Sequence, residues 1–431
     1  MHNILKKMYS IKRIALNNFL ESNKNLPVQG SQEWLNSRFE TIGGSEISTV
    51  LKLNKYQNIK QLIEQKVGIS TFKKSAPLWF GNIFEYILQQ YTEILFDTKI
   101  YETGSIPYKK SKYIKYSPDG VAVITKKNFS KIFNKNDLDN IYKDSIFHNK
   151  EVNTNTGNST NTGNINDIDK KELIVLFEFK NPFMRVIKKN EIPIHYINQP
   201  RLGMEVIDIC EVSIFIESVF RFCSYNDIVS NNIIINNKYN RFYHFDKIKF
   251  NNEPLAYSAF SLYYDKSNTN PHLLDILNNL VEYYNTNNIH EFDLSNIKNK
   301  NIINKIMENI IDYKDLKIIY HDIIINTNIY NLDTNTGNSN DIYYYEKYNN
   351  IKKFQNDIKQ SKETILNNNN LEYLGIMSFK MLDINIIPVF KNNPIDNDIL
   401  CSIEKIINII KGCKNLDNIL DKKKYINQNV I

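Results

Sequence analysis

A short apolar run that ends in two charged residues is the most informative segment of the chain. Leu173 to Phe179 is continuously apolar except for Glu178, and Lys180 follows it. A run of this length, rich in Leu, Ile, Val and Phe, is typical of a strand buried on both faces of a sheet. Because side chains alternate along a strand, Glu178 and Lys180 should share one face, and Phe179 should point to the other. Charged groups at such a position are costly unless they pair or bind a metal, so the segment predicts a sheet with a polar site at its end.

Length and composition narrow the class of protein. The 431 residues suffice for one large domain or for two to three ordinary ones. With 42% hydrophobic and 12% aromatic residues the chain can bury a core, which excludes wholesale disorder. The net charge of +7 permits a polyanionic partner without requiring one.

Cysteine spacing and apolar runs bear on the compartment. The four cysteines, at positions 210, 223, 401 and 413, fit no zinc or iron–sulfur pattern and indicate reduced thiols in an intracellular protein. The longest apolar stretch, Leu173 to Phe177, is too short to span a bilayer, so we expect no membrane. The basic first twenty residues could imitate a mitochondrial presequence, although a lead helix is the simpler interpretation.

Asparagine is unusually frequent, with 65 residues in the chain. Part of it lies in low-complexity tracts, where Thr-Asn-Thr-Gly-Asn occurs at 154–158, 160–164 and 334–338. Such tracts cannot bury enough apolar area to order themselves, so we expect surface loops. The excess resembles drift in an AT-rich genome and need not report on function.

Periodicity predicts an α/β (α+β) chain. We expect helices at 58–67, 78–96, 193–208, 343–368 and 396–411, and extended segments at 99–106, 112–117, 120–126, 173–179, 212–216, 240–250 and 375–390. Ser45 is expected to cap a helix that runs to about Leu51. Helix 78–96 carries Phe80, Phe84, Ile87, Tyr91 and Leu95 on one stripe.

Acidic residues at two strand ends predict a cation site. Asp119 follows Pro118 at a tight turn between two extended segments, and Glu178 ends the buried run. These carboxylates and the Phe179 main-chain carbonyl are hard oxygen ligands, which favour Mg²⁺, with Mn²⁺ as a substitute. Lys180 would lie beside the metal-bound water. Glu85 stands one helical turn after Gly81, whose missing side chain would leave room above the carboxylate.

The order of these motifs resembles a known family. Helix acid, strand-turn Asp, strand Glu-x-Lys and helix Gln is the order of the PD-(D/E)xK nucleases. More closely, the chain resembles the YqaJ-type viral recombinase family, which includes phage lambda exonuclease and relatives in large DNA viruses. The resemblance covers about 30–220 and rests on Trp34-Leu35-x-x-Arg38, Ile42-Gly43-Gly44-Ser45-Glu46-Ile47, Gly81-x-x-x-Glu85, Ser117-Pro118-Asp119-Gly120, Phe177-Glu178-Phe179-Lys180-x-Pro182 and Tyr196-x-x-Gln199.

The resemblance implies a fold and roles for single residues. The fold would be a restriction-endonuclease-like core, a mixed sheet flanked by helices. Asp119 and Glu178 would bind the metal, Glu85 would contribute directly or through water, and Lys180 would be the catalytic lysine. Gln199 would steady that lysine or a strand near it. Arg38 and Ser45 would lie near the terminal 5′-phosphate of the DNA. Tyr196 would either line the DNA channel or pack in the core.

The resemblance also implies an activity and partners. Relatives are Mg²⁺-dependent nucleases that digest one strand of linear duplex DNA from the 5′ end and hand the other strand to a single-strand annealing protein. The expected partners are therefore double-stranded DNA ends and an annealing protein, with a homo-oligomer left open. A viral protein of this kind would act in the host cytoplasm, in a viral factory, or in the nucleus. The alternatives are a structure-specific endonuclease and a catalytically silent DNA-binding scaffold.

Insertions set the expected domain division. A lead segment spans 1–30, and a nuclease core spans 31–224 with a low-complexity insertion at about 128–170. An insertion at 225–370 is expected to be mostly helical, and 371–431 should complete the core with a strand and a helix. The 58 residues between Asp119 and Glu178 depart from the brief connection usual in the family.

Two further features, His195 and a band of lysines, each have two interpretations. His195 precedes the Gln199 helix, and a packed or capping histidine is the simpler alternative to a catalytic one. A basic band consists of Lys109, Lys110, Lys112, Lys115, Lys126 and Lys127 beside Tyr108, Tyr113 and Tyr116; it is either a solvated face or a phosphate-tracking surface.

Overall fold

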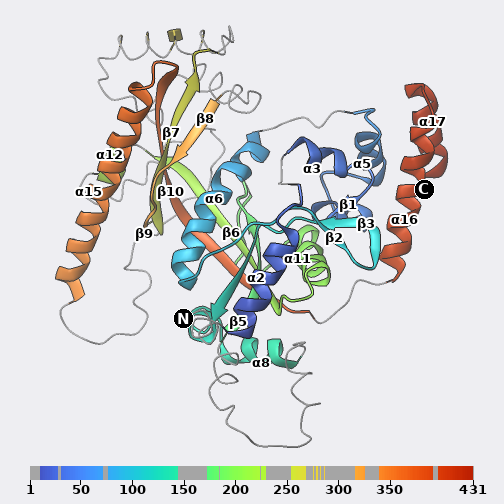
Figure 1. The fold of residues 1–431 in the computed structure, drawn as a ribbon, viewed down its shortest axis with the longest axis horizontal. Coiled ribbons are helices and arrows are strands. Elements are labelled where there is room, and N and C mark those ends of the chain that lie inside the picture. The colour runs from blue at the N-terminus through green and yellow to red at the C-terminus, as the bar shows by residue number, and fades with distance from the viewer. Residues whose placement is uncertain are drawn as a thin grey trace, which may run out of the picture.

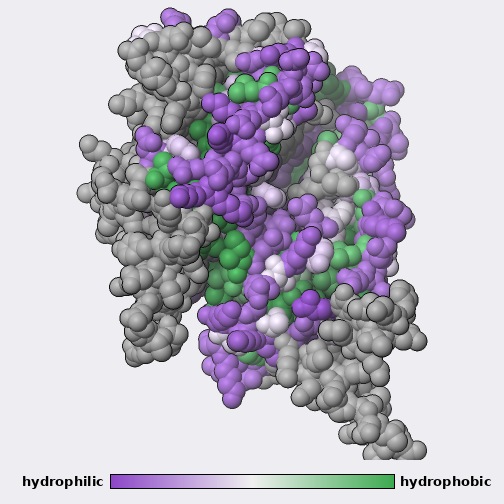
Figure 2. All heavy atoms as spheres, turned by 60° about the vertical axis from the view of Figure 1, so that its left-hand side comes forward, coloured by the Kyte–Doolittle hydropathy of each residue, from purple (hydrophilic) through white to green (hydrophobic). Residues whose placement is uncertain are grey.

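The computed structural model describes residues 10–27, 31–70, 76–143, 172–183, 185–223, 225–229, 254–267, 316–325, 339–391 and 397–430, with the single positions 275, 278, 279, 282 and 286. No helix within these ranges is both long and apolar enough to cross a membrane. The face shown in Figure 2 is mostly hydrophilic, and its apolar side chains form small patches. Most of the large apolar side chains lie instead against the two faces of a sheet.

Seven strands of the described residues form one mixed sheet (Figure 1). The order along the sheet is β4-β5-β6-β10-β7-β8, and β9 pairs with β7. β5 and β6 are parallel, and the other neighbours are antiparallel. The strands are β4 (Gly120–Thr125), β5 (Glu172–Lys180), β6 (Val212–Cys223), β7 (Ala256–Asp265), β8 (Leu316–Tyr320), β9 (Ile324–Ile325) and β10 (Leu371–Val389). The expected mixed central sheet is thus confirmed.

The parallel pair needs a crossover connection, and a helix supplies it. This helix, α11 (Ile194–Val206), lies between β5 and β6 in the chain and packs on both strands. On β5, Glu172 to Phe179 are all buried, as the apolar run predicted.

One face of the sheet is covered by the long helix α6 (Ala76–Phe96) (Figure 1). The predicted stripe is confirmed, because Phe80, Phe84, Ile87 and Tyr91 are buried in the cluster on this face. The ring of Phe84 stacks on Phe220 of β6 with centroids 4.5 Å apart. Burying such a side chain contributes about 1.5–3 kcal/mol.

The opposite face carries a second apolar cluster. Its members come from α11, from a three-stranded sheet with the order β1-β3-β2, and from several helices. The elements of this side are β1 (Ile42–Gly43), β2 (Ile106–Tyr108), β3 (Ser111–Tyr116), α3 (Gln32–Ser37), the 3-10 helix η2 (Gly44–Glu46), α4 (Ile47–Val50), α5 (Ile59–Lys66), α16 (Asn397–Lys414) and α17 (Ile419–Asn429). Ser45 lies inside η2, and Gly43 takes the N-cap position, so the expected Ser45 cap is wrong.

The lead segment is built into the fold. Its helix α2 (Ile11–Asn23) packs on β4 and β5. The ammonium of Lys12 is buried and donates to the carbonyl of Glu172 (2.7 Å) and to both carboxylate oxygens of Glu211 (2.8 and 2.9 Å). The Glu211 carboxylate also accepts from the main chain of Ile174 at 2.9 Å. The first described helix is therefore tied to the edge of the central sheet.

The segment 225–370, expected to be mostly helical, also supplies strands to the central sheet. β7, β8 and β9 fall within it, as do the helices α12 (Tyr225–Val229) and α15 (Ser339–Leu366). β7 pairs with β10 in one unbroken register from Gly375 opposite Leu262 to Met381 opposite Ala256, which explains why this segment is extended. These three strands were not among the elements expected in this segment. The predicted strand at 240–250 lies outside the described residues.

The low-complexity insertion begins later than expected. Helices α7 (Lys126–Phe129) and α8 (Lys135–Lys143) occupy its first part. Phe129, Phe133 and Ile141 are buried in the cluster beneath α6, so these residues belong to the core. The three Thr-Asn-Thr-Gly-Asn tracts lie outside the described residues.

A hydrogen-bonded chain fixes α15 to the sheet. The Ser261 hydroxyl lies 2.8 Å from Nε2 of His321, and Nδ1 of that ring lies 2.8 Å from Oδ2 of Asp357. The order Ser-His-Asp is that of a hydrolytic triad. Ser261 is fully buried, however, and His321 is 1% exposed, so a substrate cannot reach the hydroxyl and we assign the chain a structural role.

Candidate active site

The carboxyl end of β5 meets the start of β4. Gly120 of β4 pairs with Phe177 of β5, which brings the preceding Asp119 next to Glu178. Oδ2 of Asp119 accepts a hydrogen bond from the main-chain N–H of Phe179 at 2.7 Å. A Cβ on Gly120 would lie 2.1 Å from Ile100, so the turn after Asp119 needs glycine. The inferred pairing of Pro118-Asp119 with Glu178-x-Lys180 is therefore present, despite the long connection between them.

Lys180 lies among the oxygens that the sequence assigned to a metal. Its ammonium is 3.0 Å from the Phe179 carbonyl oxygen and 3.8 Å from Oδ2 of Asp119, and it forms a close ion pair with Oε1 of Glu178. Burial alone would lower the pKa of Lys180, but the charges of Glu178 and Asp119 outweigh it and raise this pKa. The ammonium remains charged at neutral pH, in the position that a cation would share.

Tyr116 is a site residue that the sequence pattern grouped with the basic band. It is buried on β3, and its hydroxyl donates to Oε2 of Glu178 at 2.8 Å. Glycines leave room for its ring, because a Cβ on Gly44 would lie 2.5 Å from it and a Cβ on Gly203 would lie 2.6 Å from it. The two oxygens of Glu178 therefore have different partners, Lys180 on one and Tyr116 on the other.

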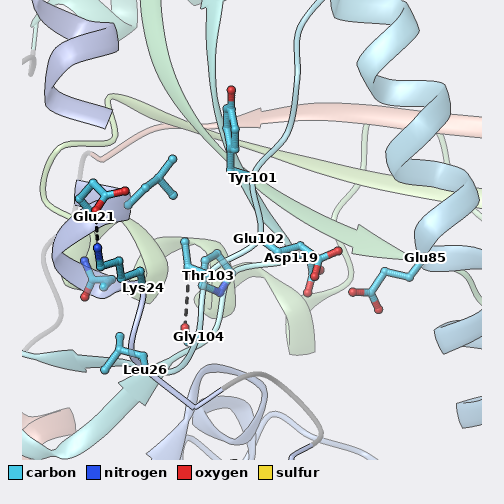
Figure 3. A pocket seen from close by; sticks show the side chains of 12 residues that line it. Glu21, Lys24, Leu26, Glu85, Tyr101, Glu102, Thr103, Gly104 and Asp119 are labelled. Carbon is cyan, nitrogen blue, oxygen red and sulfur yellow. Dashed lines mark hydrogen bonds and ion pairs between the residues drawn. The ribbon is translucent and has the colours of Figure 1, made fainter. Parts of the chain in front are cut away.

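Glu85 approaches the site from α6. Figure 3 shows Glu85 and Asp119 pointing toward one another across a cavity of about 540 Å³. Its other walls come from the end of α2 and from the segment before β2, including Glu21, Lys24 and Glu102. Burial raises the pKa of Glu85 to about 8, and the charge of Asp119 adds to this effect. The cavity is thus lined by acids at the point where it reaches the site.

Glu178 titrates near neutrality as well. Burial and the charge of Asp119 raise its pKa, Lys180 and Tyr116 lower it, and the net result is a pKa of about 7. The negative charge of Asp119 thus raises the pKa of both Glu85 and Glu178, as expected where a positive charge is stabilised.

The donor set fits a hard divalent cation. Among the described residues, no three His, Cys, Asp or Glu side chains form a ready metal cluster. The fit rests instead on Asp119, Glu178 and the Phe179 carbonyl, because the one positive group beside them, Lys180, contacts all three. Glu85 does not join them as a direct ligand in this geometry, which leaves the alternative route through water.

Arg38 is held from two sides. Its guanidinium lies 4.6 Å from the ring centroid of Trp34 and donates to Oε1 of Glu46 at 2.9 Å. Glu46 also accepts from the Gly43 main chain (2.8 Å) and from the buried ammonium of Lys66 (2.7 Å). Burial alone would raise the pKa of Glu46, but Lys66 and Arg38 lower it. Ser45 is exposed on η2 beside this network.

The remaining predicted residues lie on α11. The ring of Tyr196 is 5.5 Å from the Lys180 ammonium, so this tyrosine borders the site. Gln199 is buried and lies against Gly44, which itself packs on the Tyr116 ring. Two residues, Gly44 and Tyr116, therefore separate Gln199 from Glu178, and the structure gives no hydrogen bond between the Gln199 amide and Lys180.

The basic band is not one surface. Lys126 and Lys127 open α7 at the end of β4 that is remote from Asp119. Tyr108 and Tyr116 are buried, and Lys109 pairs with an acid of the α11–β6 connection, Asp208, at 2.8 Å. The members of the band thus face different surroundings, which favours solvated side chains, the first of the two alternatives, over a continuous phosphate-tracking surface.

Sequence reasoning missed Tyr116 as a partner of Glu178, and Glu46 and Lys66 as supports of Arg38. Each partner is far away in the chain, 62 residues for Tyr116 and Glu178 and 20 for Lys66 and Glu46. The only local signal is Glu46 of the Gly-Gly-Ser-Glu motif, whose position favours the first turn of a helix and does not point to Arg38.

A comparison with protein families identifies the segment that builds this site. Residues 33–209 match the family model described as the YqaJ-like viral recombinase domain. Over these residues the chain is similar to that domain. The matched segment runs from α3 into the α11–β6 connection and contains every residue that the sequence proposed for the site, so the expected resemblance is confirmed.

Curated relatives come from a large DNA virus. The chain is 27% identical over 222 residues to a protein of African swine fever virus (strain Badajoz 1971 Vero-adapted), and the match covers 50% of this chain and 56% of that protein. It is 25% identical over 218 residues to the protein of the same name in isolate Tick/Malawi/Lil 20-1/1983, covering 49% of this chain and 55% of that protein. The chain thus matches about half the length of these relatives.

A solved structure shows a weaker likeness. An alkaline exonuclease (LHK-Exo) from Laribacter hongkongensis is 15% identical, with a TM-score of 0.28, and the match covers 44% of this chain and 74% of that one.

Proposed function

We propose that the chain is a divalent-metal-dependent deoxyribonuclease, an exonuclease that digests linear double-stranded DNA in the 5′-to-3′ direction with Mg²⁺. The observation that carries the proposal is the meeting of Asp119, Glu178, the Phe179 carbonyl and Lys180 at one strand end. The YqaJ-like domain and the relatives in a DNA virus support a role in viral recombination or genome processing.

The protein groups have separate tasks in phosphodiester hydrolysis. Asp119, Glu178 and the Phe179 carbonyl would hold the cation, which when bound supplies a Lewis acid and an acidified water. A water oxygen forms a bond to phosphorus as the P–O3′ bond breaks, which leaves a 5′-phosphate and a 3′-hydroxyl. Lys180 offers a permanent positive charge to the phosphate as negative charge builds up. Glu85, with its raised pKa, can exchange a proton with water at neutral pH.

A preference for 5′-phosphorylated ends would come from Arg38. A guanidinium binds a phosphate through two parallel hydrogen bonds, and Trp34 and Glu46 hold this one in place. We further propose DNA ends and a single-strand annealing protein as partners, in the host cytoplasm or nucleus.

The decisive experiment is digestion of linear duplex DNA with and without a 5′-phosphate, in Mg²⁺ and in EDTA. We expect cleavage only with Mg²⁺, faster on phosphorylated ends, and lost in Asp119→Asn and Lys180→Met. Equal degradation by the wild type and both variants would reject the site. Circular plasmid cut as fast as linear DNA would replace the exonuclease by an endonuclease, and binding without cleavage would leave a scaffold.

A further inference from the structure

A row of three rings with a cation at each end runs from the surface to Lys180. It consists of Lys55, Tyr56, His195, Tyr196 and Arg185. The Lys55 ammonium lies 4.9 Å from the Tyr56 ring, and that ring meets His195 edge-on at 5.9 Å. His195 lies 4.1 Å from Tyr196, whose ring has the Arg185 guanidinium at 5.8 Å. Because the Lys180 ammonium is 5.5 Å from this same ring, the row ends at the proposed catalytic lysine.

The inner members of the row are fixed by buried partners. Arg185 forms a close ion pair with Glu217 of β6, which is fully buried and stands beside Lys180 in the register of the parallel strands. The His195 carbonyl accepts from the Ser48 hydroxyl of α4, which holds the start of α11. These contacts leave the outward faces of the cations and rings for a ligand.

The loop that carries the outer members is also held. The main-chain N–H of Tyr56 donates to Asn54 at 2.9 Å, and the Asn54 amide donates to Thr49 at 2.9 Å. The Tyr56 side chain nevertheless is 69% exposed, the highest exposure of any large aromatic residue in the part of the chain that the structure describes. An exposed ring on an anchored loop, next to a lysine, is a surface on which a nucleic acid base can stack.

Polar atoms and charge point to an anionic ligand. Within the described residues, Nε2 of His195 is buried and has no hydrogen-bond partner, and no acid pairs with Lys55. Burial lowers the pKa of His195, and the charges of Arg185 and Lys55 lower it further, as expected where three basic groups converge. On the other side of Lys180, Glu85 and Asp119 line an acidic cavity. A phosphate backbone is therefore attracted to the row and repelled by that cavity.

We propose that this row is the binding track for the DNA strand that enters the active site. One base stacks on Tyr56, Lys55 and Arg185 contact phosphates, and Tyr196 delivers the strand to Lys180. The ligand class is a single strand of nucleic acid, because exposed rings between cations stack on unpaired bases whatever their sequence. The inference rests on the proposed nuclease function for the direction of the strand, whereas the binding itself does not depend on cleavage.

The test is binding of a fluorescein-labelled oligothymidylate to the full chain in EDTA, measured by fluorescence anisotropy at several salt concentrations. Tyr56→Ala should weaken binding about five- to tenfold, while Tyr56→Phe, which keeps the ring, should bind as the wild type does. Lys55→Ala should weaken binding about two- to threefold and reduce its salt dependence. Tyr113→Ala is the matched control, because Tyr113 also has a lysine beside its ring, Lys112 at 5.2 Å, but lies outside the row.

Arg185→Ala needs a companion variant, since it leaves Glu217 buried without its cation. The double variant Arg185→Ala/Glu217→Gln removes both charges and should still bind at least fivefold more weakly than Glu217→Gln alone. If Tyr56→Ala binds within twofold of the wild type, or if Tyr113→Ala loses as much affinity, the proposed track is wrong. A chain that binds through the row but never cleaves DNA would reject the nuclease function and leave the track in place.

Discussion

The ammonium of Lys180 lies 3.0 Å from the main-chain oxygen of Phe179, an atom that was expected to coordinate the metal. The same ammonium contacts Asp119 and Glu178, the other two expected ligands. Two positive charges cannot share these oxygens at close range, so Lys180 must move when a divalent cation binds. The Lys180 ammonium and a divalent cation therefore compete for the same oxygens.

Replacement of Lys180 should therefore separate metal binding from catalysis. In Lys180→Met the carboxylates lose their competitor, and we expect Mg²⁺ or Mn²⁺ to bind about tenfold more tightly, while cleavage falls at least a hundredfold. Isothermal titration calorimetry measures the first effect and digestion of linear DNA the second. Weaker cation binding in this variant would mean that Lys180 supports the site rather than competes for it.

Tyr116 should affect how the rate of DNA cleavage depends on pH at the acidic end of the range. Its hydroxyl lowers the pKa of Glu178 by donating to the carboxylate, so Tyr116→Phe should raise that pKa. The protonated fraction of Glu178 then grows at neutral pH, and the rising limb of the rate against pH should move to higher pH by about one unit. Tyr108→Phe is the matched control, because Tyr108 is also buried and donates to a glutamate, Glu205, at 3.2 Å. An equal displacement in both variants would argue against a specific role.

Cation binding should release protons. The pKa values of Glu178 and Glu85 are raised to about 7 and about 8, so both carboxyls hold protons at pH 6 and must lose them to meet a cation. Without metal, folding is favoured by these protons, and this contribution is lost as the pH rises through 7 to 8. We expect Mg²⁺ affinity, and the rise in unfolding temperature that Mg²⁺ causes, to increase between pH 6 and pH 8.5. Calorimetry in two buffers of different ionisation enthalpy counts the protons, and no release at pH 6.5 would contradict the assignment.

Lys12 should be needed for stability. Lys12→Met leaves Glu211 buried without this cation and should lower the free energy of unfolding by about 3–5 kcal/mol. Lys12→Met/Glu211→Gln removes the uncompensated charge and should recover part of the loss, as measured by denaturant titration. Lys24→Met is the surface control, since Lys24 is paired with Glu21 in solvent, and it should leave the free energy of unfolding almost unchanged. A double variant no more stable than Lys12→Met would show that the charge balance is not the cause.

Local sequence patterns predicted the main residues of the site, but they did not predict the side chains that surround these residues. The strand period placed Glu178 and Lys180 on one face, and the turn signal found Asp119, because both depend on neighbours in the chain. Tyr116 could not be chosen in this way. It stands among several tyrosines of one short segment, and only the packing of β3 against α11 decides that its ring turns inward.

The order of the strands in the sheet was harder to predict than the strands and helices themselves. A strand at 375–390 and a closing helix at 396–411 were expected and are present as β10 and α16. That β10 pairs with both β6 and β7 depends on contacts between residues more than one hundred positions apart. For the same reason β7 was missed, since its burial comes from β10 and not from its own sequence.

The position of β10 has a consequence for the order of folding. β10 lies between β6 and β7, although it is made after both of them and after β8. Until residues 371–389 leave the ribosome, β6 presents a bare edge beside the finished β5, and β7 has no partner on that side. Exposed edges of this kind pair with strands of other chains. The nascent protein therefore passes through a stage in which β5, the strand of the active site, is complete but the sheet still has open edges. A chaperone that covers the β6 edge at this stage would raise the yield of native protein.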